Sequence, residues 1–181
     1  MLCERANLTP VADLLEQTQV GESPAKSLLD IGVGFGTYGI IARAFMDIWR
    51  EGRMSRDQWK VKIDGIELEE CYRNPIWEIY DKVYLGDFES IMPTLKNYDV
   101  TLCLHMIEHL PTKEKGEKLL DLLEAKTTKR IIIGTPNTFY STGDYPLESQ
   151  GHHTFWPPEE FEKRGYTVMK LYGDTLAWKD K

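Results

Sequence analysis

The residues with the clearest chemical potential form a carboxylate-and-glycine turn near the start of the chain. An apolar run at 27–29 predicts a buried strand, Asp30 follows it, and three glycines come next, Gly32, Gly34 and Gly36. Glycine lacks a Cβ and tolerates positive φ, so this turn lets the backbone approach a nucleotide-like ligand closely. A carboxylate at Asp30 would repel a diphosphate, but it can hold an ammonium group. S-adenosylmethionine fits these requirements, because it has a methionyl head, a ribose and an adenine but no phosphate.

A second register of the same glycines favours a different ligand. The segment 34–39 fits the dinucleotide fingerprint G-x-G-x-x-G letter for letter. That fingerprint should begin where the strand ends, at Gly32, and the register that begins there places Thr37 where the third glycine belongs. A nicotinamide oxidoreductase is therefore an alternative that the spacing disfavours.

Two further carboxylates follow predicted strands. Glu67 closes the apolar run at 61–67, and Asp87 follows the run at 82–85. A carboxylate at the second strand end can accept both ribose hydroxyls. One at the third can accept from the adenine amino group, with Leu68 and Phe88 on the two sides of the ring. Each acid alone is also typical of a helix start, but three in register predict one ligand site.

All four histidines fall in two places that can supply acid–base chemistry. His105 and His109 follow a predicted strand, with Glu108 between them, and His152 and His153 precede the last predicted helix. The spacing H-x-x-E-H matches a zinc-peptidase motif, but that motif needs one long helix and this segment follows a strand. Methyl transfer to oxygen requires removal of a proton, and the pKa of histidine suits this near neutrality. We expect His105 and one of the later pair to act as base or substrate contact, with Glu108 and His109 shaping the turn.

The same cluster allows a metal interpretation. Glu108, His109, His105 and a histidine from the later loop could ligate a divalent ion, since imidazole and carboxylate suit zinc, manganese or magnesium. Our prediction is that no metal is bound there, with the metal site as the alternative.

The elements that must position these residues alternate between strands and helices. Strands are expected at 27–31, 61–67, 82–85, 98–104, 130–134, 166–172 and 175–179. Helices are expected at 9–19 (capped by Thr9 and opened by Pro10), 36–51, 74–80, 113–125 and 158–164. This alternation predicts an α/β doubly wound, mostly parallel seven-stranded sheet. The last strand should be antiparallel, because a short turn at Gly173-Asp174 joins the final two strands.

Composition restricts the class of protein. The chain has 181 residues, 41% of them hydrophobic, and a formal net charge of −7, which disfavours broad nucleic-acid or anionic-membrane binding. We expect one domain over 1–181, with a helical segment at 1–26 and a substrate lid loop at 135–156. Three widely spaced cysteines indicate reduced thiols, and neither a signal peptide nor a membrane-length apolar run is expected, so we predict a cytoplasmic protein.

From the first strand onward the chain resembles the class I S-adenosylmethionine-dependent methyltransferases. The resemblance rests on segments 28–36, 65–68, 86–88, 98–110, 134–137 and 152–166. It is most similar to the branch with ubiquinone-type and natural-product O-methyltransferases, which implies a Rossmann-like methyltransferase fold and a small-molecule acceptor.

The resemblance also implies residue roles. Asp30 and the glycines would hold the methionyl part, Glu67 the ribose, and Asp87 with Phe88 the adenine. The histidine cluster looks like the metal site of small-RNA 2′-O-methyltransferases, although those carry glutamate where this chain has His105. A metal-dependent RNA 2′-O-methyltransferase and a non-catalytic S-adenosylmethionine-binding module therefore stand as alternatives. The chain is short compared with many members, so the resemblance does not identify the residues that bind the acceptor.

Overall fold

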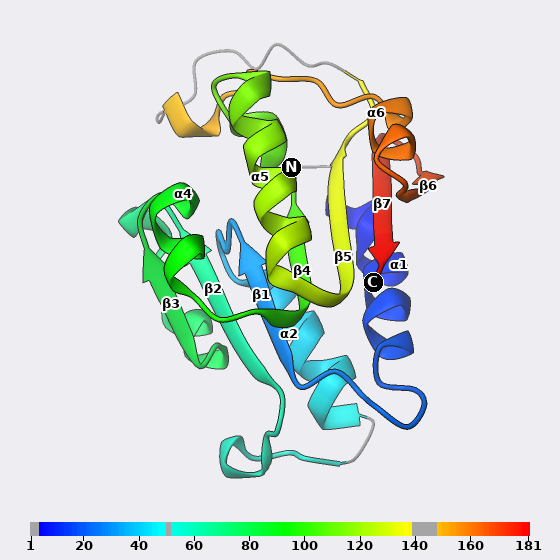
Figure 1. The fold of residues 1–181 in the computed structure, drawn as a ribbon. Coiled ribbons are helices and arrows are strands. Elements are labelled where there is room, and N and C mark those ends of the chain that lie inside the picture. The colour runs from blue at the N-terminus through cyan, green and yellow to red at the C-terminus, as the bar shows by residue number, and fades with distance from the viewer. Residues whose placement is uncertain (1–3, 50–51, 139–147) are drawn as a thin grey trace.

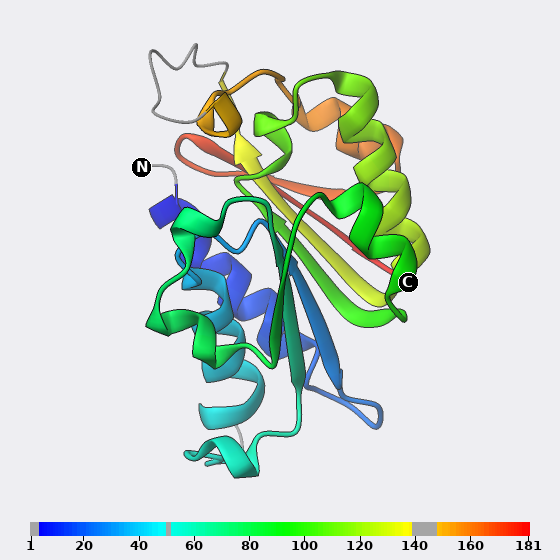
Figure 2. The same cartoon turned by 90° about the vertical axis from the view of Figure 1, so that its left-hand side faces the viewer.

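In its described residues, the computed structural model has a seven-stranded sheet between two layers of helices (Figures 1 and 2). It describes residues 4–49, 52–138 and 148–181. The strand order is β3-β2-β1-β4-β5-β7-β6. The strands are β1 Ser27–Ile31, β2 Lys62–Glu67, β3 Lys82–Leu85, β4 Tyr98–Leu104, β5 Thr127–Pro136, β6 Thr167–Lys170 and β7 Asp174–Asp180.

The direction of the strands confirms the predicted fold class. Strands β1 to β5 are mutually parallel, whereas β7 is antiparallel to both β5 and β6. The predicted turn at Gly173-Asp174 is wrong by one residue, because Asp174 is fully buried and already pairs with Pro136 as the first residue of β7. The parallel strands β1, β2, β4 and β5 end at one edge, and β7 begins there.

The helices are α1 Glu4–Gln17, α2 Thr37–Arg43, α4 Phe88–Ile91, α5 Lys113–Lys126 and α6 Pro158–Lys163. Two departures from the sequence prediction concern the N-terminal half. Helix α1 begins before Pro10, which lies inside it rather than at its start, because Asn7 and Val11 are buried and tie this helix to the sheet. The predicted helix 36–51 is α2 continued by a π-helical turn, Ala44–Ile48, where Arg43 and Asp47 form a buried ion pair.

Each face of the sheet has its own apolar core. One contains Val11 and Leu15 of α1 together with Ala42 of α2. The other contains Leu119 and Leu123 of α5, with residues of α4 and α6. Figure 2 shows α1 and α2 on one side of the sheet and α4, α5 and α6 on the other. This arrangement leaves the carboxyl edge of the parallel strands as the place where functional side chains gather.

That edge contains the switch point of the topology. Strands β1 and β4 are neighbours, and from them the chain builds outward in opposite directions. In open α/β sheets, ligands bind in the crevice beyond the carboxyl ends at such a point. Among the described residues, no helix has the length and apolar character needed to cross a membrane.

Candidate functional site

The glycine turn leaves β1 in a conformation that favours glycine. Gly32 has φ +83° and Gly36 has φ +91°, values that residues with a Cβ rarely adopt. A Cβ at Gly32 would also lie 2.8 Å from Cγ of Met106, which follows β4. The turn is held in place by the Trp77 indole N–H, which donates to the carbonyl of Gly34 at 2.8 Å.

Glu67 lies at the end of β2 and faces this turn. Its Oε2 accepts from the backbone N–H of Gly34 at 2.7 Å, and its Oε1 accepts from the N–H of Glu69 at 2.9 Å. In a dinucleotide site, backbone N–H groups of the glycine turn bind the diphosphate. Here a carboxylate occupies one of them, so the arrangement suits a ligand without phosphate.

Asp30 is buried at the end of β1 and is bonded to a tyrosine that the sequence did not single out. Only 1% of Asp30 is exposed, and its Oδ2 accepts from the Tyr80 hydroxyl at 2.6 Å. Burial raises the pKa of the Asp30 carboxyl to about 7; the hydrogen bond from Tyr80 lowers it, and the charge of Glu67 raises it further. The carboxyl therefore titrates near neutrality.

Two glycines make room for Tyr80. A Cβ on Gly39 would lie 2.3 Å from Cζ of the Tyr80 ring. One on Gly65 would lie 2.3 Å from Cγ2 of Val33 and 3.3 Å from Cε1 of Tyr80. The absence of side chains at these two positions was the sequence signal for a bulky residue packed above them, but it does not say which residue fills the space.

Asp87, at the end of β3, is engaged by protein groups. Its Oδ1 caps α4 by accepting from the N–H of Glu89 at 2.9 Å, and its Oδ2 accepts from Lys115 Nζ at 2.6 Å. Partial burial raises the pKa of this carboxyl, but the hydrogen bonds from Lys115 and Glu89 outweigh that effect, so the net pKa is lowered. Phe88 is only 3% exposed and packs in the core, whereas Leu68 is 55% exposed at the rim. The structure therefore brings Leu68, and not Phe88, to the surface, and the adenine assignment stays a prediction.

His105 lies directly after β4 in a left-handed conformation, with φ 53°. Its Nε2 is 2.9 Å from Nδ2 of Asn7, and since an amide nitrogen donates, this imidazole nitrogen accepts. The same Asn7 nitrogen donates to Oδ2 of Asp174 at 3.2 Å, and His105 Nδ1 is 3.5 Å from Oε1 of Glu108. Helix α1 and strand β7 thus hold the imidazole between them.

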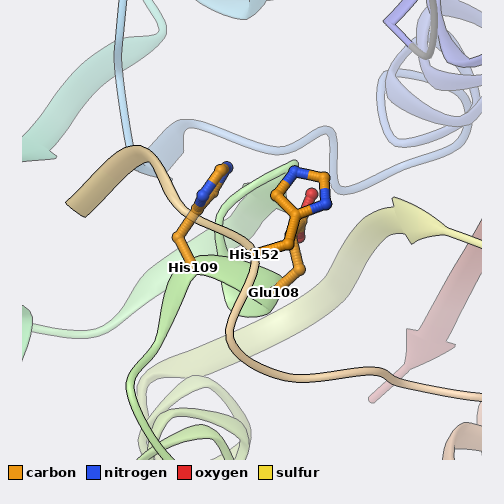
Figure 3. A group of neighbouring side chains, drawn as sticks. All are labelled: Glu108, His109 and His152. Atoms are coloured by element: carbon orange, nitrogen blue, oxygen red, sulfur yellow. The ribbon is translucent and has the colours of Figure 1, made fainter. Parts of the chain in front are cut away.

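Glu108, His109 and His152 form a second cluster beside His105 (Figure 3). One potential ligand atom from each lies within 4.8 Å of the others, and Figure 3 shows His152 reaching the cluster from the segment that precedes α6. Nδ1 of His109 is 3.0 Å from the carbonyl of Gly151; a carbonyl only accepts, so Nδ1 donates.

The carboxylate and the two imidazoles of this cluster are groups that ligate divalent ions. Zinc ligands at about 2.0–2.1 Å from the metal lie about 3.4 Å apart in a tetrahedron, so the three side chains would have to draw closer. Burial raises the pKa of the Glu108 carboxyl, but His105 and His109 outweigh it and lower the net pKa. Burial lowers the pKa of the His152 imidazole, against the charge of Glu108, which raises it. His153 is exposed, and its backbone N–H donates to the carbonyl of Glu108.

The later part of the 135–156 connection is fixed to the β4–α5 turn. Thr154 donates to the carbonyl of Ile107 through its hydroxyl and to that of Glu108 through its N–H. Trp156 is fully buried against Gly116 of α5, so it packs the connection onto the helix layer. Residues 139–147 of the predicted lid loop lie outside the described residues.

The structure adds partners that sequence reasoning missed. These are Tyr80 for Asp30, Asn7 and Asp174 for His105, and Lys115 for Asp87. Asn7 and Asp174 are separated by 167 positions, and no local spacing connects them.

Comparison with known proteins supports the fold. No protein-family model matches the chain, and no curated protein matches it. Among solved structures, it is similar to the methyltransferase domain of a bacterial Hen1 (CtHen1-CN), with 17% identity, a TM-score of 0.64, and coverage of 99% of this chain and 100% of that one.

Two other solved structures are similar to nearly the whole chain. A SAM-dependent methyltransferase from Archaeoglobus fulgidus has 18% identity and a TM-score of 0.62, with 98% of this chain and 96% of that one covered. The N-terminal domain of EvdMO1, crystallised in the presence of SAH and D-fucose, has 13% identity and a TM-score of 0.65, with 96% and 82% covered. At these identities the likeness confirms the methyltransferase-type fold.

Proposed function

We propose that this protein is an S-adenosylmethionine-dependent methyltransferase that acts on a hydroxyl group of a small molecule. The observation that carries the proposal is the carboxylate of Glu67 on the Gly34 N–H, at the switch point of a methyltransferase-type sheet. This pairing favours a cationic nucleoside without phosphate over a dinucleotide. S-adenosylmethionine, when bound, supplies an electrophilic methyl group.

In this proposal, the position of each residue along the carboxyl edge determines its role. Glu67, at the rim of β2, would accept from the ribose hydroxyls. Asp30, deeper at the end of β1, would favour the ammonium of the methionyl group once its carboxyl is ionised. His105 and His152 lie at the β4 end, where His105, held by Asn7 and Glu108, would orient the acceptor hydroxyl and His152 would receive its proton.

Calorimetry with isosteric variants tests the cofactor site. Asp30→Asn and Glu67→Gln should each weaken S-adenosylmethionine binding about 10- to 100-fold, the usual loss for a hydrogen bond to a charged group. The matched controls Asp13→Asn and Glu16→Gln, exposed on α1, should bind as the unmodified protein does. Binding of NAD but not S-adenosylmethionine, or unchanged affinity in both site variants, would refute the proposal.

A metal-dependent RNA 2′-O-methyltransferase is the second candidate, and the Glu108–His109–His152 cluster favours it. Titration with Mn²⁺ or Zn²⁺ separates the two. The first proposal predicts methyl transfer to a small hydroxyl compound in the presence of a chelator. The second predicts metal binding that Glu108→Gln weakens and transfer to RNA only with metal. A non-catalytic binding module would bind S-adenosylmethionine and release no S-adenosylhomocysteine with any acceptor.

A further inference from the structure

Residues 149–151, here called the strap, bridge the two halves of the carboxyl edge. On one side, the Ser149 hydroxyl donates to Oε1 of Glu69 at 2.6 Å, and the Gln150 amide donates to the hydroxyl of Tyr72. On the other side, the carbonyl of Gly151 accepts from His109. In Figure 1 the short helical turn Glu148–Gln150 lies above the β2 and α4 side of the molecule, far along the sheet from β5.

The strap's partners are connected directly to the proposed cofactor residues. Glu69 donates its N–H to Oε1 of Glu67, whose other oxygen holds Gly34. The Tyr72 ring packs edge-on against Phe35 of the glycine turn, with centroids 5.6 Å apart. The strap is therefore three contacts away from the glycine turn through Glu69 and two contacts away through Tyr72.

The bonds of the strap are polar and only partly buried. Ser149, Gln150 and Gly151 are half-buried, and none of them belongs to either apolar core. Segments held mainly by accessible hydrogen bonds open at low free-energy cost. The strap runs from the β2 end to the β4 end, and β1 with its glycine turn lies between these strands, so opening the strap would open this part of the carboxyl edge.

We propose that the strap is a gate over the cofactor crevice, whose opening limits both entry and exit of S-adenosylmethionine and its demethylated product. This inference rests on the proposed function. The strap hydrogen bonds would have to break for a ligand to pass in either direction. Weakening them therefore speeds association and dissociation by the same factor and leaves affinity unchanged.

The experiment measures association and dissociation of S-adenosylhomocysteine by stopped flow and by displacement. Ser149→Ala and Tyr72→Phe each remove one strap hydrogen bond, and Tyr72→Phe keeps the ring that packs on Phe35. Each variant should raise both rates about fivefold, and the double variant about 20-fold, from the net contribution of one hydrogen bond. Gln150→Ala, which breaks the Tyr72 bond from the other side, should match Tyr72→Phe. Ser23→Ala and the exposed Tyr172→Phe serve as controls with unchanged rates.

The outcomes separate the gate from the proposed function. Unchanged rates in the double variant, or faster dissociation alone with weaker affinity, would overturn the gate and leave the cofactor site intact. If the unmodified protein binds neither S-adenosylmethionine nor S-adenosylhomocysteine, the proposed function is wrong and the gate with it.

Discussion

The Tyr80→Phe variant should destabilise the protein more at alkaline than at acid pH. The substitution removes only the hydroxyl that donates to Asp30, and the ring stays in the space left by Gly39 and Gly65. Any effect therefore comes from the hydrogen bond and from the charge state of Asp30, because the apolar packing is retained.

The magnitude follows from the titration of Asp30. Burial raises its pKa from the ordinary 3.8 to about 7, which corresponds to about 4 kcal/mol. Between these two values the folded protein keeps a proton that the unfolded chain has released, so the free energy of unfolding falls as pH rises toward 7. Tyr80 opposes this rise in pKa, so its loss raises the pKa further and extends the fall in stability above pH 7. We expect a loss of about 1 kcal/mol at pH 6, and of about 2–3 kcal/mol at pH 8.5, where a bond to an ionised carboxylate is lost.

Urea unfolding of both proteins at the two pH values measures the difference, with the exposed Tyr172→Phe as a matched control that should change neither. An equal loss at pH 6 and pH 8.5 would show that Asp30 does not titrate between them. No loss at either pH would show that the hydroxyl makes no buried bond.

Three further predictions concern the site and the layers that support it. Gly116→Ala should lower the free energy of unfolding by about 1–3 kcal/mol, because the new Cβ would lie 2.0 Å from Cζ2 of Trp156. Alanine favours helices and would otherwise stabilise the protein, so the sign of the change in thermal unfolding tests this clash. Arg43→Met should cost about 2–3 kcal/mol in chemical denaturation, because it removes one of the two arginines that pair with the buried Asp47 and leaves only Arg53, and a loss below about 1 kcal/mol would contradict the buried ion pair. Binding of S-adenosylmethionine at pH 6.5 should release protons from Asp30, so affinity should increase as pH rises to about 7. Calorimetry in two buffers of different ionisation enthalpy measures the proton release, and equal binding enthalpies in the two buffers would exclude it.

The fold was predictable from the sequence because its signals are local. Apolar runs bounded by glycine, proline and acids place β1, β3 and β4 at their observed bounds. The start of α1 was missed because Pro10 has a strong preference for the first turn, and the burial of Asn7 and Val11 overrides that preference.

The site was predictable only in part. The ends of the strands place its residues, but partners far away in the sequence orient their side chains. Asp30 and Glu67 lie where their strands end, as expected. Tyr80, whose hydroxyl donates to Asp30, comes from 50 positions away. Phe88 follows Asp87 in sequence, yet capping of α4 directs its ring into the core.

The bridge from Asn7 to Asp174 has a consequence for the protein during its synthesis. The two side chains are 167 positions apart, and both approach the imidazole of His105. A nascent chain can form the parallel strands early, but it cannot fix His105 until its last strand has left the ribosome. Polypeptides released a few residues before Asp174 would therefore lack the carboxylate that holds the Asn7 amide against His105.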